Sequence, residues 1–273
     1  FDKQAKSLGI DLVVMCNDHA SLKFSKRLNV HNYVLSASSF LETDLIEEIV
    51  KNNSDIILRT GGATLIEIDE VVTQILMIAP KAKITLLAGI QLYPTPIEDL
   101  HLKSLRSIEE HFKQKPGIVM GLADHIDGDH KYAMHLPVLA LSYGAKVLEK
   151  HITIDRKDKL EDYEAALGID QFFDFVDLIR TAETAIGDGS LDYMVDSGSY
   201  QKYRLVSRKK VIAATNISSG TILTKEMLNF KRADNGSQLS ELNKIIGSTL
   251  TEDKIIDQGI DLSDVKILDS AKI

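Results

Sequence analysis

Short apolar runs and helix-like segments alternate along about the first two thirds of this chain, and this alternation restricts the possible folds more than any other feature. The predicted strands are residues 11–15, 32–36, 55–59, 83–88, 118–122 and 146–149, and helical patterns cover residues 41–52, 66–77, 98–112 and 170–185. The runs are apolar on both faces, as strands of a parallel sheet covered by helices must be. The pattern therefore predicts a parallel α/β architecture.

The number of repeating units indicates which parallel α/β fold to expect. Six strand-plus-helix units follow a short helical segment that ends at Gly9. We expect a (β/α)8 TIM-type barrel that lacks its first two β/α units in this chain. The alternative is an open, doubly wound sheet, but no glycine-rich phosphate turn follows the first strand.

The composition changes near Gly187, where the chain becomes polar and rich in glycine and serine. We predict a partial barrel domain over residues 1–189, a linker over residues 190–206 and a small, mostly β domain over residues 207–273. A domain of this size is marginal as an independent unit, so we expect it to pack on another surface.

Composition and charge exclude several function classes. The formal net charge of −8 disfavours non-specific nucleic-acid binding. No apolar stretch approaches the ~18 residues needed to cross a bilayer, so no membrane partner is expected. The single cysteine, Cys16, rules out a disulfide within the chain and favours a reducing, cytoplasmic location.

Two histidines each follow a predicted buried strand. His125 closes the run Gly121-Leu-Ala-Asp-His125, and His151 closes the run that contains Glu149-Lys-His151. The carboxyl ends of neighbouring parallel strands meet at one rim, where active sites are built. Two imidazoles at that rim suit a divalent transition metal such as Mn or Zn. The alternative is a pair of surface histidines without a shared function.

Several motifs in this order resemble the N-acetylneuraminate (sialic acid) synthases. They are Tyr93-Pro-Thr-Pro96, Gly121-Leu-Ala-Asp-His125, Glu149-Lys-His151-Ile-Thr-Ile-Asp155-Arg156 and Asp162-Tyr-Glu-Ala-Ala-Leu167. The C-terminal part resembles that family's SAF domain, a β-clip fold also called antifreeze-like, in Ser207-Arg-Lys-Lys-Val-Ile-Ala-Ala214, Gly220-Thr-Ile-Leu-Thr224 and Phe230-Lys-Arg232. The likeness covers almost the whole chain. The combination is specific, although each motif alone is weak.

The resemblance implies a C–C bond-forming transferase of carbohydrate biosynthesis. Such an enzyme condenses phosphoenolpyruvate with an N-acyl hexosamine to a nonulosonic acid, releases phosphate and uses a divalent metal, Mn or Mg. The resemblance assigns the metal to His125 and His151, and catalytic roles to Asp162 and Tyr93. It assigns substrate binding to Tyr93, Gln91, Arg59 and Arg232. In this family the SAF arginine, matched by Arg232, reaches the partner's active site, so the resemblance also implies a domain-swapped homodimer.

The chain departs from the family pattern at positions expected to hold phosphate and carboxylate. Polar or charged residues are replaced at Met15, Val34, Ala37, Ser39 and Ala123. Arg59 replaces a serine and either restores one positive charge for phosphate or forms a structural ion pair. The alternative function is therefore a diverged paralogue that keeps sugar and metal binding but has lost phosphoenolpyruvate chemistry, as a carbohydrate-binding protein or an enzyme with a different donor.

Three further features each allow two interpretations, and a fourth, Lys150, allows one prediction. The loop after His125 contains Asp127, Asp129, His130 and His135, which either extend the metal shell or form a solvated loop. Asp124 either orients an imidazole or caps the following turn. Strand alternation predicts that Lys150 points away from His151. The two prolines at positions 94 and 96 make the Tyr93 loop rigid, which is compatible with either a structural or a pocket role.

Overall fold

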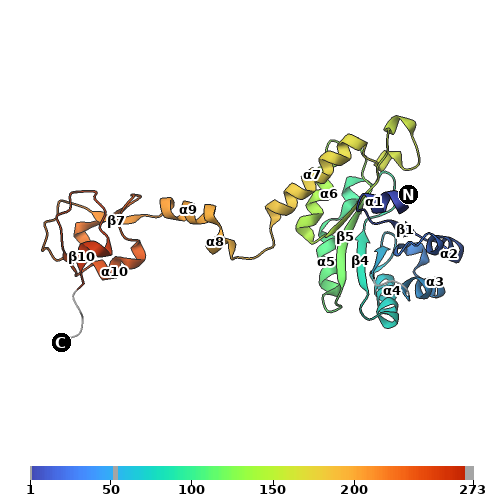
Figure 1. Ribbon diagram of the computed structural model, residues 1–273, viewed down its shortest axis with the longest axis horizontal. Coiled ribbons are helices and arrows are strands. Elements are labelled where there is room, and N and C mark those ends of the chain that lie inside the picture. Colours follow the sequence, from blue (N-terminus) through green and yellow to red (C-terminus); the bar gives the residue numbers. More distant parts are fainter. Residues whose placement is uncertain (1, 52–54, 268–273) are drawn as a thin grey trace. The chain divides into compact units, whose positions relative to one another are not determined.

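The computed structural model describes residues 2–51 and 55–267 of the chain (Figure 1). The chain divides into two compact units, residues 1–187 and residues 188–273. Each unit has its own buried apolar cluster, and each is described by itself below.

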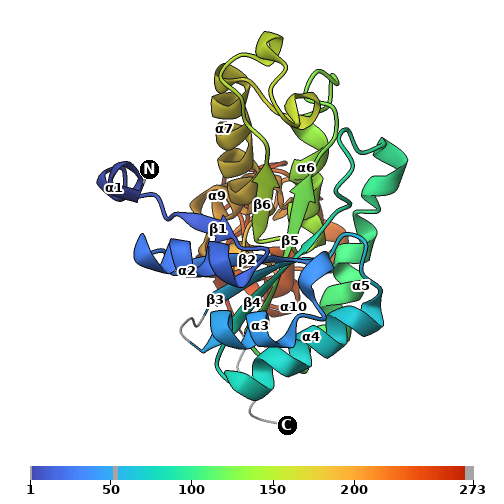
Figure 2. The same ribbon diagram turned by 90° about the vertical axis from the view of Figure 1, so that its right-hand side faces the viewer.

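A curved sheet of six parallel strands forms the centre of the first unit (Figure 2). Its strands are β1 (Val13–Met15), β2 (Asn32–Ser36), β3 (Asp55–Arg59), β4 (Lys83–Ala88), β5 (Ile118–Asp124) and β6 (Val147–Lys150). They pair in chain order, each with its successor. A doubly wound sheet would reverse this order at a switch point, so the curled half-barrel confirms the barrel-type prediction and excludes the alternative.

Helices precede, connect and follow the strands of this sheet. They are α1 (Asp2–Ser7), α2 (His19–Arg27), α3 (Thr43–Val50), α4 (Leu65–Ile78), α5 (Lys103–Phe112), α6 (His135–Leu139) and α7 (Ile169–Ile186). Residues 52–54, at the end of the predicted helix 41–52, lie outside the described residues. The predicted helix 98–112 is shorter than expected, because His101 adopts a left-handed conformation (φ 40°) and separates the 3-10 turn Ile97–Leu100 from α5.

Side-chain alternation divides the sheet into two faces. One face packs against the helices and is fully buried, with Leu35, Leu58, Leu86 and Leu122 at its centre. The inner face is more open, and Met15 on β1 is 39% exposed there. Polar side chains at the carboxyl ends of the strands therefore have room on the inner face, where the candidate site lies.

The second unit is small and built from short elements. They are α8 (Tyr193–Asp196), α9 (Gly198–Ser207), β7 (Lys210–Ala213), β8 (Leu228–Lys231), α10 (Leu242–Ile245), β9 (Thr249–Leu250) and β10 (Val265–Lys266). The strands form two antiparallel pairs, β7 with β8 and β9 with β10. The segment predicted as a linker, residues 190–206, contains α8 and nearly all of α9. In the described part of the chain, no helix combines the length and apolar character needed to span a membrane.

A buried lysine holds the second unit together. The Nζ atom of Lys254 lies 2.7 Å from Oδ2 of Asp264 and 2.6 Å from Oε1 of Glu252, and its side chain is only 5% exposed. These two carboxylates raise the pKa of Lys254 against the opposing effect of burial. The interaction ties the turn before β10 to the loop that follows β9.

We predict that Lys254→Met lowers the free energy of unfolding of the second unit by about 3 kcal/mol, because it leaves the Asp264 carboxylate without its cation. Lys231→Met is the matched control, since Lys231 pairs with Asp257 at the surface and should cost less than about 1 kcal/mol. Urea unfolding read by hydrogen exchange of residues 208–266 measures both. Equal losses in the two variants would contradict the prediction.

Candidate functional site

The register of β5 and β6 decides which side chains face inward. Asp124 pairs in register with Lys150, and Ala123 with Glu149. Lys150 Nζ lies 2.6 Å from Asp124 Oδ2, and both side chains are at most 1% exposed. Lys150 therefore points away from His151, as predicted, and Asp124 contacts this lysine rather than an imidazole. Glu149 and Ala123 alternate with Lys150 and Asp124 along the two strands, so they face the inner side of the sheet.

Three rings meet at this rim. The centroids of His125 and His151 lie 5.2 Å apart, and Tyr93 lies 4.7 Å from His125 and 5.2 Å from His151. Tyr93 comes from the loop after β4, His125 directly follows β5, and His151 directly follows β6. The structure thus brings three of the predicted site residues into one cluster.

Backbone contacts hold His125 in a defined orientation. Its Nδ1 atom lies 2.8 Å from the carbonyl oxygen of Ile90, and since a carbonyl only accepts, Nδ1 carries the proton. The backbone amide of Thr95 donates to the carbonyl of His125 at 2.8 Å, which ties the Tyr93 loop to the end of β5. In the neutral ring, Nε2 therefore has a free lone pair. This atom is buried and has no hydrogen-bond partner among the described residues.

Glu149 lies between an arginine and this imidazole. Nη2 of Arg59 is 2.6 Å from Oε1 of Glu149, and Nε donates to Oε2 at 3.3 Å. The Nη2 contact is an ion pair without hydrogen-bond alignment, so Oε1 is buried with no hydrogen bond to any described residue. Oε1 is also 3.9 Å from Nε2 of His125. Burial alone would raise the pKa of Glu149, but His125 and Arg59 outweigh it and lower that pKa.

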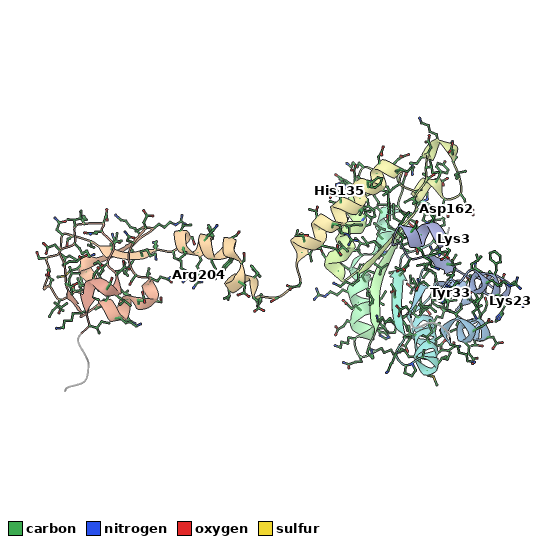
Figure 3. The ribbon with its side chains drawn as sticks, in the orientation of Figure 1. Lys3, Lys23, Tyr33, His135, Asp162 and Arg204 are labelled. Atoms are coloured by element: carbon green, nitrogen blue, oxygen red, sulfur yellow. The ribbon has the colours of Figure 1, made fainter. Side chains whose placement is uncertain are left out.

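The other side of the cluster carries Asp162, which Figure 3 labels on the loop beyond β6. Its Oδ2 atom lies 3.7 Å from Nδ1 of His151, too far for a direct hydrogen bond. Burial and the neighbouring His125 lower the pKa of His151, so its ring is neutral near neutral pH. Burial and the charge of Asp162 raise the pKa of Tyr93, so its hydroxyl keeps its proton.

Arg156 positions the loop that carries Asp162. Its Nη1 atom donates to the backbone carbonyls of Tyr163 and Ala166, and Nη2 lies 2.9 Å from Asp129 and 3.5 Å from Asp127. The two aspartates are therefore engaged in an ion pair that joins two loops. This pairing argues against the interpretation that they extend the metal shell.

His130 and His135, in the segment that follows His125, pack away from the cluster of rings. The ring of Tyr132 lies 5.7 Å from His130 and 6.3 Å from His135, and His135 is exposed (Figure 3). No described ring contact joins either histidine to His125 or His151. For His130 and His135, too, a solvated loop is therefore favoured over an extension of the metal shell.

Two predicted site residues are not part of the cluster. Gln91 is exposed on the loop after β4. Arg232 belongs to the second unit, where it is exposed and lines a cleft of about 360 Å³ with Leu205 and Lys210. Of the positions that depart from the family pattern, Val34, Ser39 and Ala123 are buried.

Sequence reasoning did not assign a role to Glu149, although it is part of the motif Glu149-Lys-His151. Strand alternation could have indicated a role for Glu149, because it places residues 149 and 151 on the same face of the sheet. Within residues 2–51 and 55–267, no group of three or more His, Cys, Asp or Glu side chains is arranged to hold a metal ion. The pair of histidines is therefore the nearest approach to a metal centre in the described part of the chain.

Comparison with known proteins assigns both parts of the chain. The model of the NeuB family matches residues 1–191, and the model of the SAF domain matches residues 208–266. Pseudaminic acid synthase of Campylobacter jejuni is 29% identical over 232 residues, which are 85% of this chain and 64% of that protein. The N,N'-diacetyllegionaminic acid synthase of the same species is 29% identical over 92% of this chain and 73% of its own length.

A solved structure confirms the architecture of the chain. A spore coat polysaccharide biosynthesis protein E from Chromobacterium violaceum superposes with a TM-score of 0.76 at 23% identity, over 97% of this chain and 76% of its own. At this identity the likeness concerns the fold alone. The chain spans less than two thirds of the length of the pseudaminic acid synthase, so the shared region is a part of that relative.

We predict that Arg59 and Glu149 are energetically coupled. Arg59→Met should lower the free energy of unfolding by about 2 kcal/mol in the parent chain, and by much less when Glu149 is already glutamine. Because the pKa of Glu149 is lowered from 4.5, this stabilisation is complete above pH 4.5 and is lost as the pH falls through the lowered pKa.

A double-mutant cycle in urea, at neutral and at acid pH, measures this coupling. The surface pair Lys51 and Glu47 is the matched control, with a coupling below about 1 kcal/mol. A coupling between Arg59 and Glu149 no larger than that of the control would show that the ion pair is not stabilising.

Proposed function

The chain belongs to the NeuB family, and from this premise we propose that it is a synthase of nonulosonic acids. In the proposed reaction, phosphoenolpyruvate and the aldehyde of an N-acyl amino sugar form a new C–C bond, and phosphate leaves. Relatives named as pseudaminic and legionaminic acid synthases support this product class. The observation that carries the proposal is the buried Nε2 atom of His125, which has no hydrogen bond to a described residue, in a ring whose centroid lies 5.2 Å from that of His151.

We propose that His125 and His151 hold a divalent metal, Mn or Mg. The residues fit such an ion, because the Nδ1 contact of His125 leaves Nε2 as a buried acceptor in the neutral ring, without a hydrogen bond to a described residue, and His151 is neutral near neutral pH. When bound, a divalent metal supplies Lewis-acid polarisation of the aldehyde oxygen of the sugar. The contact of Nδ1 with the Ile90 carbonyl fixes the orientation of the His125 ring, and the amide of Thr95 holds the backbone of His125 in place.

The neighbouring side chains supply the polar contacts of the proposed sugar site. Tyr93 Oη keeps its proton and can donate a hydrogen bond to an oxygen of the substrate. The half-buried Asp162 carboxylate can accept a hydrogen bond from a sugar hydroxyl. We assign Gln91 and Arg232 to substrate binding as well, with Arg232 contributed by the partner of a domain-swapped homodimer. A cytoplasmic location, consistent with the free Cys16, is part of the same proposal.

One observation favours a second candidate function. Arg59 was expected to bind the phosphate or carboxylate of the donor, but its guanidinium is paired with Glu149. Val34 and Ala123, at positions where the family pattern has polar groups, are buried and apolar. In this second candidate the chain binds a sugar and a metal but does not use phosphoenolpyruvate.

We predict that the full chain binds Mn²⁺, and that His125→Ala and His151→Ala each weaken binding by about 100-fold or more. Electron paramagnetic resonance of free Mn²⁺ measures the dissociation constants, and His135→Ala is the control because His135 is exposed and lies outside the cluster. Since the pKa of His151 is lowered from 6.5, its ring is protonated only at a pH below that value, so Mn²⁺ binding should persist at pH 6.5. Unchanged affinity in both variants would remove the metal from the proposal.

The reaction itself is tested by phosphate release when the full chain is mixed with phosphoenolpyruvate, Mn²⁺ and a panel of N-acyl hexosamines. We expect release with at least one sugar, and a fall in kcat of about 100-fold in Tyr93→Phe, which lacks the proposed donor. Asp162→Asn should raise KM for the sugar. Mn²⁺ binding without phosphate release from any sugar would reject the synthase and leave the second candidate.

A further inference from the structure

One arginine gathers the backbone on which Asp162 stands. Arg156 lies in the loop between β6 and α7, and its side chain is only 16% exposed. Its Nη1 atom donates to the carbonyls of Tyr163 at 2.7 Å and Glu164 at 3.3 Å, and also to the carbonyl of Ala166. Asp162 comes directly before this stretch, so the same contacts fix where its carboxylate lies.

The backbone of this loop depends on such support. Asp162 has φ 58° and ψ 19°, and Lys159 has φ 46°, so both residues adopt the left-handed conformation that residues other than glycine seldom take. Such conformations persist where the surrounding contacts determine them. No direct hydrogen bond joins the Asp162 carboxylate to Nδ1 of His151, which is 3.7 Å away. The place of the carboxylate is therefore set by its backbone and not by the imidazole.

The loop after β5 completes this arrangement. Nη2 of Arg156 lies 2.9 Å from Oδ2 of Asp129, and the preceding residue, Gly128, donates its amide to the carbonyl of Glu164 at 2.7 Å. A Cβ atom added to Gly128 would overlap both the carbonyl oxygen of Ala166 and Nη1 of Arg156. The two loops thus approach each other at a point where only glycine leaves enough room.

We propose that Arg156 is a positioning residue for the acceptor sugar, because it holds the Asp162 carboxylate where that group accepts a hydrogen bond from a sugar hydroxyl beside His151. The proposal rests on the proposed function, since it takes Asp162 as a group that binds the sugar. It adds Arg156 and Gly128 to the residues that decide how tightly the sugar binds. Both act through the backbone and not by contact with the sugar.

The planar shape of the guanidinium, and not its charge alone, suits Arg156 to this role. Nη1 contacts the carbonyls of one loop while Nη2 faces Asp129 of the other. A lysine offers a single ammonium group, which keeps the charge but not both sets of contacts. The Asp129 side chain is 74% exposed, so water screens its ion pair and that contact contributes little by itself. The contacts with the carbonyls therefore account for most of the positioning.

Isothermal titration of the full chain, in the presence of Mn²⁺, with each sugar of the panel of N-acyl hexosamines tests the proposal. For the sugar that binds most tightly, Arg156→Met should raise the dissociation constant by about 10-fold or more. The same change should raise it by less than about 2-fold when Asp162 is already asparagine, because Arg156 acts through that carboxylate. Arg156→Lys should raise the dissociation constant by at least about 5-fold, since it keeps the charge but not the planar donors.

The assay of phosphate release supplies a second readout. In Arg156→Met the KM for the sugar should rise, while kcat at saturating sugar stays within about 3-fold of the parent value. A general loss of structure would lower kcat as well, so this division between KM and kcat distinguishes positioning from unfolding.

Matched variants control for the added methyl group and for the lost charge. Gly128→Ala leaves Arg156 in place but forces the two loops apart, so it should weaken sugar binding as Arg156→Met does. Gly168→Ala is its control, because a Cβ atom there meets only an ordinary contact at 3.5 Å. Arg180→Met removes an exposed cation, and both control variants should keep the sugar affinity of the parent chain. Circular dichroism checks folding, and Gly128→Ala provides the test if Arg156→Met does not fold.

The outcomes separate this proposal from the one on which it rests. Parent-like sugar affinity in Arg156→Met and Gly128→Ala overturns the positioning role, while the proposed sugar site stands. Losses of equal size with and without the Asp162 carboxylate also overturn it, because Arg156 then acts by another route. A parent chain that binds a sugar but releases no phosphate rejects the synthase and leaves the positioning role in place. If the parent chain binds no sugar of the panel, both proposals are rejected.

Discussion

The buried ion pair between Asp124 and Lys150 determines which way the carboxyl ends of β5 and β6 face. The two side chains lie opposite each other in the parallel ladder and are almost completely excluded from solvent. A shift of one residue in either strand would leave a buried charge unpaired and would turn His125 or His151 toward the helices. The candidate site therefore depends on an interaction that lies on the other face of the sheet.

On the inner face of the sheet, the charged side chains at the ends of the same strands lie close to groups of opposite or potentially opposite charge. Glu149 is shared between the Arg59 ion pair and the neighbourhood of His125, and Asp162 lies close to His151 without a direct hydrogen bond. Arg59 is therefore best understood together with Glu149, its ion-pair partner, and not as an isolated residue.

The first and second units are stabilised by different kinds of interaction. The first buries a large apolar face of its sheet beneath the helices, with fully buried leucines on successive strands. The second has short strands and a small apolar cluster, and it uses the buried Lys254 with two carboxylates to hold its C-terminal turns together. Small units have too little apolar surface for a large core, so specific polar contacts account for a larger share of their structure.

Local patterns in the sequence were sufficient to predict the strands, the parallel architecture and the family, because apolar periodicity and the order of short motifs are properties of the chain itself. The alternation of strand residues likewise predicted that Lys150 points away from His151. The partner of Arg59 could not be predicted, because Glu149 is 90 residues away in the chain and its approach depends on the curvature of the sheet. Only the tertiary structure decided that Asp127 and Asp129 pair with Arg156, and that Nε2 of His125 lies 3.9 Å from Oε1 of Glu149. Such distances arise from packing and not from the order of residues in the sequence.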